Sequence, residues 1–124
     1  MNGALRGVVV AHGELAPALI AAAEEISGLR GALVAVSNTG LGREALEQRV
    51  MEAVAGQPAV VFVDLPSGSC LFAAMRRLAS LAGVRVVTGV NLVMLLEFLF
   101  HRADPPEEVA QRAAEAGARG ISAR

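Results

Sequence analysis

The sequence predicts an α/β fold: a doubly wound, mainly parallel four-stranded sheet in the order 2-1-3-4, with helices on both faces. The main observation is that apolar runs of strand length alternate along the chain with longer segments of helical periodicity. The second is that hydrophobic residues make up 54% of the 124 residues and charged residues 19%, without a repeat or linker. Residues 1–124 are therefore expected to form one domain with a substantial core.

The first half of the chain is predicted to hold two strands, each followed by a helix. Residues 5–11 are almost entirely apolar, which is typical of a strand buried on both faces. Residues 14–27 follow as a helix that Gly28 ends. Residues 32–36 are the second strand, and 41–55 show apolar residues at helical spacing.

The second half repeats this alternation. Residues 59–63 are an apolar strand, and 69–81 form a helix opened by Ser-Gly-Ser. Residues 84–87 are the fourth strand, followed by a helix at 91–100 that is apolar nearly all round.

The last helix is predicted from the motif DPPE that begins at Asp104. Aspartate is a favoured N-cap, and proline is favoured in the first helical turn. We expect this helix to run to about residue 116, with Gly117 and Gly120 loosening the tail.

Composition argues against several classes of partner. Four Phe and no Trp or Tyr leave no stacking platform for single-stranded nucleic acid, and a net charge of -1 without a basic cluster argues against DNA. One cysteine excludes an internal disulfide and a multi-cysteine metal site. The two histidines lie far apart in the sequence and have no acidic cluster beside them, so neither a metal nor a cofactor is expected.

The apolar stretches do not predict a signal peptide or a membrane span. His12, Glu14 and Pro17 interrupt the first of them. The most apolar region, 84–100, contains one arginine, one asparagine and one glutamate, and lacks the roughly 18 uninterrupted apolar residues of a span. We expect a cytoplasmic protein.

Small polar residues follow each predicted strand. Because the carboxyl ends of parallel strands meet at one edge of a sheet, these residues are expected to lie together and to mark the site. They include His12 and Gly13 after the first strand, Ser37 after the second, Asp64 after the third and Asn91 after the fourth.

His12 and Asp64 are the strongest candidate pair. In the order 2-1-3-4 their strands are neighbours, so the two side chains could meet. A carboxylate that accepts a hydrogen bond from Nδ1 would fix the imidazole tautomer and leave Nε2 free to react. The alternative is a histidine that caps a strand end beside an aspartate that starts a turn.

A second candidate is Ser67-Gly68-Ser69 at the start of a helix. Backbone N–H groups at a helix N-terminus bind anions, so this turn could hold a phosphate beside the imidazole. The alternative is an ordinary serine N-cap.

Three other features have ordinary explanations. The stretch GLGREA at 40–45 imitates a dinucleotide fingerprint, but it follows the second strand, and a glycine-rich turn explains it. Cys70 is read as a small apolar residue in a helix's first turn, where the helix N-terminus could lower its pKa. His101 is read as a solvated residue at a helix end.

Three motifs together resemble the IIA component of the mannose/fructose/sorbose family of the bacterial sugar phosphotransferase system. They are AHG at 11–13, DLPSGS at 64–69 and GVNLVML at 89–95, and the resemblance covers essentially the whole chain. It implies that His12 takes a phosphoryl group from the phosphocarrier HPr and passes it to a IIB component. It further implies that Asp64 orients His12.

The resemblance also implies that Ser67, Gly68 and Ser69 hold the phosphoryl oxygens. Gly13, Ser37 and Asn91 are expected at the rim of the site from their positions after the strands. Four positions depart from the family pattern, which is DxxGGSPxN in the second motif. Ser67 replaces a glycine, Cys70 a proline, Phe72 an asparagine, and Val93 a proline of the third motif. These departures put partner choice and rate in doubt, while His12 and Asp64 are retained.

Two alternatives stay open: the phosphotransfer subunit of a dihydroxyacetone kinase, and a regulatory protein of the same fold that feeds no transporter. In the transport reading, the IIB acceptor is a separate chain, and contact with the membrane is indirect, through the IIC and IID subunits. Family members commonly dimerise, sometimes by exchanging a C-terminal strand, so a short fifth edge strand is left open for 120–124. The apolar helix at 91–100 also predicts a homodimer, because one of its sides would otherwise face water; packing of the last helix over it is the alternative.

Overall fold

The computed structural model describes residues 4–124 and confirms the predicted sheet. Its four strands are parallel and lie in the order β2-β1-β3-β4. The strands are β1 (Arg6–Ala11), β2 (Leu33–Ser37), β3 (Ala59–Val63) and β4 (Val84–Thr88). The helices are α1 (Leu15–Ser27), α2 (Arg43–Val54), α3 (Ser69–Leu78), α4 (Leu92–Leu99) and α5 (Pro106–Arg119).

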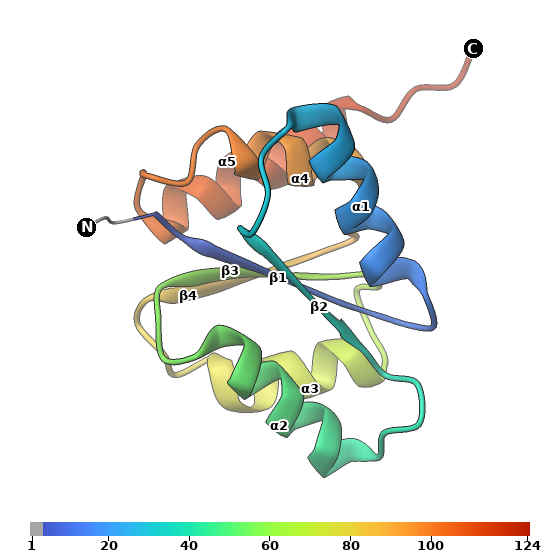
Figure 1. Ribbon diagram of the computed structural model, residues 1–124, viewed down its shortest axis with the longest axis vertical. Coiled ribbons are helices and arrows are strands. Elements are labelled where there is room, and N and C mark those ends of the chain that lie inside the picture. Colours follow the sequence, from blue (N-terminus) through green and yellow to red (C-terminus); the bar gives the residue numbers. More distant parts are fainter. Residues whose placement is uncertain (1–3) are drawn as a thin grey trace.

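Helices cover both faces of the sheet, as predicted (Figure 1). Alternate residues of each strand point to opposite faces. Val9 and Phe62 belong to the core beneath α1, α4 and α5, while Val8 and Val61 belong to the core beneath α2 and α3. Both faces of the central strands are therefore buried, which explains why their sequences are continuous apolar runs.

Most of the apolar helix α4 is covered within its own chain, with Met94, Leu95, Phe98 and Leu99 buried. Phe98 packs edge-on against Phe62, with ring centroids 5.4 Å apart, and the absence of a side chain at Gly7 makes room for its ring. On another side, α5 packs along α4, where Met94 lies against Gly117. Packing of α5 thus covers one side of α4, whereas Val93 and Phe100 stay exposed, and the homodimer stays a prediction.

The predicted ends of two helices are wrong. Helix α3 ends at Leu78 rather than at residue 81, because a turn follows in which Leu81 N–H donates to Leu78 O. Helix α5 continues through Gly117 to Arg119. Gly117 is a buried contact point against α4 and not the start of a loose tail.

The start of α5 also differs from the prediction. Pro105, not Asp104, occupies the N-cap position, and no side chain caps the helix. Asp104 instead accepts a hydrogen bond from Arg112, eight residues later in α5, at 2.8 Å between Oδ2 and Nη1. The proline in the first turn is present as expected.

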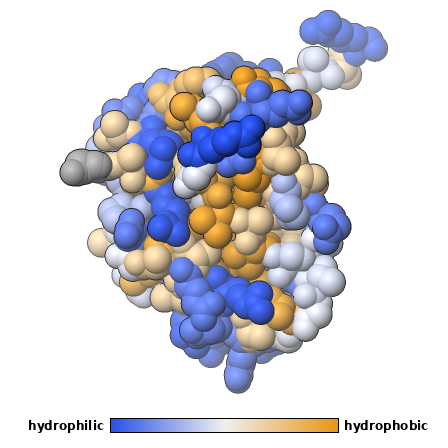
Figure 2. All heavy atoms as spheres, viewed as in Figure 1, coloured by the Kyte–Doolittle hydropathy of each residue, from blue (hydrophilic) through white to orange (hydrophobic). Residues whose placement is uncertain are grey.

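The chain end forms no fifth strand within the described residues. Residues 121–124 are irregular and project away from the end of α5 (Figures 1 and 2). Among residues 4–124, no helix combines the length and the apolar character needed to cross a membrane.

A buried carboxylate joins α2 and α3, the two helices that cover one face of the sheet. The Glu47 side chain on α2 is 5% exposed and lies 3.6 Å from Nε of Arg76 and 3.5 Å from Nε of Arg77, both on α3. Burial of a carboxylate is tolerated when opposite charges pair with it. This contact joins the last turn of α3 to α2.

Strand β2 is the edge strand of the sheet that lies nearer the viewer in Figure 1. Apolar residues gather down the middle of the face shown in Figure 2. Within β2, Val34 is half-buried and Ala35 is exposed. Arg6, Arg49 and Glu52 border the strand. Charged side chains beside an edge strand discourage pairing with other strands.

We predict that Gly117→Ala lowers the stability of the fold. A Cβ at this position would lie 2.5 Å from Cγ of Met94, so the buried Met94 side chain or α5 itself must shift. The expected loss is about 1–2 kcal/mol in the free energy of unfolding, because overpacking outweighs the helix propensity of alanine. Urea unfolding measures it. Gly83→Ala is the control, since its Cβ meets nothing closer than Pro58 at 3.5 Å; equal stability of both variants with wild type would contradict the packing argument.

Candidate functional site

The register of the two central strands brings His12 and Asp64 together. Val10 of β1 is paired with Val63 of β3, and the ladder continues one step further, because Asp64 N–H donates to Val10 O at 3.2 Å. His12 and Asp64 therefore leave the sheet side by side, at the point where the strand order reverses. Ligand sites of doubly wound sheets lie at such points.

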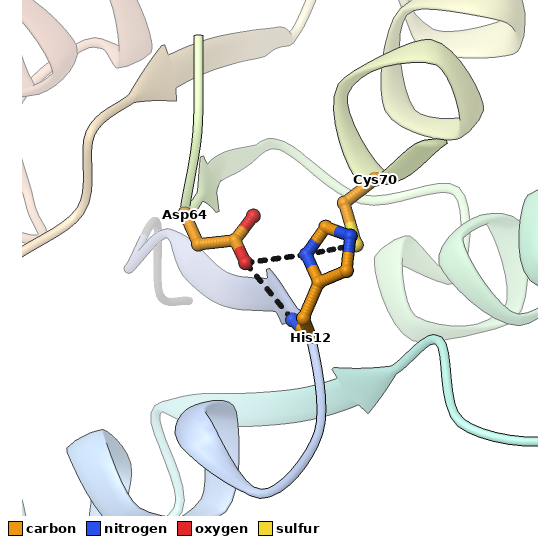
Figure 3. A group of neighbouring side chains, drawn as sticks. All are labelled: His12, Asp64 and Cys70. Atoms are coloured by element: carbon orange, nitrogen blue, oxygen red, sulfur yellow. Dashed lines mark hydrogen bonds and ion pairs between the residues drawn. The ribbon is translucent and has the colours of Figure 1, made fainter. Parts of the chain in front are cut away.

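Two hydrogen bonds join these residues, so the predicted contact is confirmed (Figure 3). Asp64 Oδ2 lies 2.7 Å from Nδ1 of His12 and accepts a second hydrogen bond from the His12 backbone N–H at 2.9 Å. The imidazole is thus held by its ring and by its own backbone. Since the acceptor is a carboxylate, Nδ1 carries the proton and Nε2 has the free lone pair.

The environment of Asp64 favours its ionised form. Its side chain is 7% exposed, and burial alone would raise its pKa. The hydrogen bonds from the His12 ring and backbone, the charge of His12, and the Leu65 N–H at 2.9 Å from Oδ1 together lower that pKa below the usual value. A fixed negative charge therefore faces Nδ1 over the whole neutral range.

The other side of the imidazole is accessible. The His12 side chain is 43% exposed, and its hydrogen bonds within residues 4–124 all involve Nδ1. Gly13, at φ +61°, turns the chain away from the ring directly after the strand. Nε2 is consequently available to a reaction partner from outside.

The start of α3 lies beside the same ring. Cys70, in the first turn, places Sγ 3.7 Å from Nδ1 of His12. Gly68 is the N-cap residue and has φ +95°, a conformation that favours glycine. Ser67 and Ser69 are exposed, and neither side chain caps the helix, so the ordinary N-cap reading is wrong. The first N–H groups of α3 are left without side-chain partners near an imidazole.

A loop after β2 supports the turn at His12. Ser37 Oγ donates to Gly13 O at 2.8 Å, and Asn38 Oδ1 accepts from Gly13 N–H at 3.2 Å. Ser37 is the last residue of β2 and Asn38 follows it, and of the two only Ser37 is a predicted site residue. The structure makes both residues supports of the turn.

Asn91 has a different place. Its Oδ1 accepts from Met94 N–H at 3.0 Å as the N-cap of α4, and its Nδ2 donates to Gly117 O at 3.2 Å. These bonds join α4 to α5, and none of them reaches His12.

Cys70 departs from its predicted chemistry, although it packs as a small buried residue as expected. Burial and the nearby charge of Asp64 raise the pKa of its thiol to about 11, so the suggested lowering by the helix N-terminus is wrong. Its sulfur, Asp64 Oδ2 and His12 Nδ1 lie in one group whose ligand atoms are within 4.8 Å of one another. The sequence predicts the pair of His12 and Asp64 but not the third member, because the place of Cys70 depends on how α3 packs beside β1.

Comparison with known proteins identifies the family. The family model of the fructose IIA component of the phosphotransferase system matches residues 7–114. The chain belongs to this family.

Solved structures agree with the assignment at the level of the fold. A phosphotransferase-system EIIA component from Streptococcus agalactiae superposes with a TM-score of 0.88 at 19% identity, covering 96% of each chain. A mannose/sorbose-specific IIA subunit from Enterococcus faecalis gives 0.85 at 21% identity, covering 98% of this chain and 95% of that one. A IIA protein associated with the fucose utilization operon of Streptococcus pneumoniae gives 0.77 at 23% identity, covering 98% and 96%. No curated protein matches the sequence.

We predict that Asp64→Asn lowers the free energy of unfolding at neutral pH, and that this loss disappears in acid. Asp64 has a lowered pKa in the fold, so its contribution is complete above the ordinary aspartate pKa of about 3.9 and is lost as the pH falls through the lowered value. Above pH of about 5, the variant should unfold about 1–3 kcal/mol more easily than wild type. Urea unfolding at decreasing pH should show this gap shrinking, and a gap that stays constant or widens below about pH 4 would contradict the assignment.

Proposed function

We propose that this IIA component carries a phosphoryl group on Nε2 of His12, receiving it from phospho-HPr and passing it to a separate IIB component during sugar uptake. Membership of the family supports a phosphocarrier role in the sugar phosphotransferase system. The observation that carries the proposal is the 2.7 Å contact between Nδ1 of His12 and Oδ2 of Asp64, on a ring that is otherwise half-exposed. One nitrogen is held by a carboxylate, and the other is open to a partner.

The transfer step needs little from the protein besides this arrangement. The Nε2 lone pair attacks phosphorus, the bond from phosphorus to the donor breaks, and the donor keeps that electron pair. The ring then bears Nδ1–H and a phosphorylated Nε2, so it carries positive charge. Asp64, ionised and fixed at Nδ1, stabilises that charge.

The start of α3 is suited to the phosphoryl oxygens. Its first turn lies beside the imidazole, and its N–H groups carry the positive end of the helix dipole. Gly68 allows the sharp entry into the helix, and the exposed hydroxyls of Ser67 and Ser69 flank it. Positioning and charge stabilisation are the main requirements of phosphoryl transfer.

The surroundings of the site suit a protein partner. Leu15, Leu65 and Phe72 are exposed by 44%, 50% and 71%, and each lies within a few residues of a site residue along the chain. Beside Ser69 and Phe72 a hollow of about 350 Å³ is also lined by Asn38 and Arg43. Exposed apolar side chains of this kind mark interaction surfaces.

We predict that incubation with phosphoenolpyruvate, enzyme I and HPr adds one phosphoryl group to the chain. The group should be acid-labile and base-stable, as expected of phosphohistidine, and intact-mass measurement detects it. His12→Ala should remove the gain while the fold is kept, since the side chain lies at the sheet edge and not in the core. His101→Ala, which changes the other histidine, serves as the matched control and should be phosphorylated normally. Phosphate on Ser67 or Ser69, or no gain by the wild type, would overturn the proposal.

We predict that Asp64→Asn slows phosphorylation by about 10–10³-fold while the protein stays folded. The amide can contact Nδ1, but it cannot stabilise the positive ring. A comparable change in a serine protease costs about 10⁴-fold, and a smaller effect is expected here because the donor is already activated. Rapid quenching followed by mass measurement gives the rate. Phosphorylation at the wild-type rate would reduce Asp64 to a turn former.

A further inference from the structure

We propose that His12, Asp64 and Cys70 form a binding site for a divalent transition metal with the ligand preferences of zinc, and that the bound metal switches off phosphoryl transfer. The second half of the proposal rests on the proposed function, whereas metal binding does not depend on it.

The three side chains supply a set of ligand atoms that zinc prefers: an imidazole nitrogen, a carboxylate oxygen and a thiolate sulfur. They come from three elements, since His12 follows β1, Asp64 follows β3 and Cys70 opens α3, and their ligand atoms converge in Figure 3. All three atoms lie within 4.8 Å of one another. A cysteine close to a histidine and an aspartate is a more specific arrangement than a buried thiol alone.

The spacing requires a modest adjustment, because the ligand atoms of the three residues lie within 4.8 Å of one another and those of a zinc site lie closer. Nδ1 of His12 lies 2.7 Å from Asp64 Oδ2 and 3.7 Å from Cys70 Sγ. In a tetrahedral zinc site, bonds of about 2.0–2.3 Å keep the ligand atoms about 3.3–3.6 Å apart. The ring must therefore move about half an ångström away from the carboxylate, which a half-exposed side chain permits. Three protein ligands would leave a fourth position for water.

Binding would change the protons of the site in a defined way. The metal displaces the thiol proton of Cys70, which leaves to solvent, and a coordinated thiol is held as thiolate. The metal also takes the lone pair of Nδ1. The proton that Nδ1 carried then moves to Nε2, so the imidazole stays neutral in its other tautomer.

This tautomer cannot accept a phosphoryl group. The proposed transfer requires the lone pair of Nε2, and in the metal-bound form that nitrogen bears a proton. At the same time Asp64 is engaged by the metal and no longer faces Nδ1–H. The metal would therefore inhibit without covering Nε2, by exchanging the roles of the two ring nitrogens.

Binding is tested on metal-free, unphosphorylated protein. Titration calorimetry with zinc chloride should show one ion per chain, and cobalt(II) should give a thiolate-to-metal charge-transfer band. Cys70→Ala should bind zinc at least about 10-fold more weakly, because loss of even an outer partner of a metal site costs 10–100-fold. Cys70→Ser, which is closer in shape, should lose the cobalt band.

The matched control is His101→Ala. His101 forms the other contact between a histidine and a carboxylate, with Nδ1 2.9 Å from Glu97 Oε2, and should not affect zinc binding. Absence of zinc binding by the wild type would overturn the proposal. Equal binding by Cys70→Ala, or loss of binding in His101→Ala, would also overturn it, because the ion would then lie elsewhere.

Inhibition is tested with preformed phospho-HPr, and each protein is compared with its own metal-free rate. At a zinc concentration that fills the wild-type site and leaves that of Cys70→Ala largely empty, phosphorylation of the wild type should slow at least about 10-fold and that of Cys70→Ala should change little. A chelator should restore the wild-type rate. Zinc binding without inhibition would overturn the tautomer switch. Failure of metal-free protein to accept phosphate would count against the proposed function, and the calorimetry would still decide the metal site.

Discussion

The site depends on one contact, the hydrogen bond between Nδ1 of His12 and Oδ2 of Asp64. Its length of 2.7 Å is possible because β1 and β3 are adjacent and parallel, with Val10 opposite Val63. A shift of one residue in this register would turn the aspartate to the other face of the sheet. The buried valines that fix the register therefore also fix the position of the histidine relative to the aspartate.

The strand order and the location of the site could be predicted from the sequence because they follow from simple rules. Apolar runs separated by helices specify a parallel sheet, and such a sheet brings the residues after its strands to one edge. His12, Asp64 and Ser37 were found in this way. Asn91 satisfies the same rule, yet its amide caps α4 and bonds to α5, because the chain after β4 turns at once into a helix. Position at an edge does not determine which way a side chain points.

Other features depended on packing that the sequence does not reveal. The placement of Cys70 beside His12 requires the position of α3 relative to β1, which is set by helix contacts such as the pairing of Glu47 with Arg76 and Arg77. Glycine often follows the end of a helix, so the sequence around Gly117 predicts that the last helix ends before it. Gly117 lies inside α5 because Met94 of α4 fills the space that a side chain would take. Both cases concern contacts between elements, where local propensity carries no information.

What Nδ1 of His12 binds, a proton or a metal ion, determines whether Nε2 can accept a phosphoryl group. With a proton on Nδ1 and Asp64 opposite, the ring presents a nucleophile at Nε2. With a metal on Nδ1, the proton moves to Nε2, and Nε2 is no longer a nucleophile. The raised thiol pKa of Cys70 keeps its sulfur protonated at neutral pH in the absence of metal, so the pair of His12 and Asp64 is the state on which phosphoryl transfer relies.

Identification of the phosphorylated nitrogen tests this account most directly. A long-range nitrogen–proton NMR correlation spectrum of the phosphorylated protein should place the phosphoryl group on Nε2 of His12, with a proton retained on Nδ1. A phosphoryl group on Nδ1 would contradict the assigned role of Asp64.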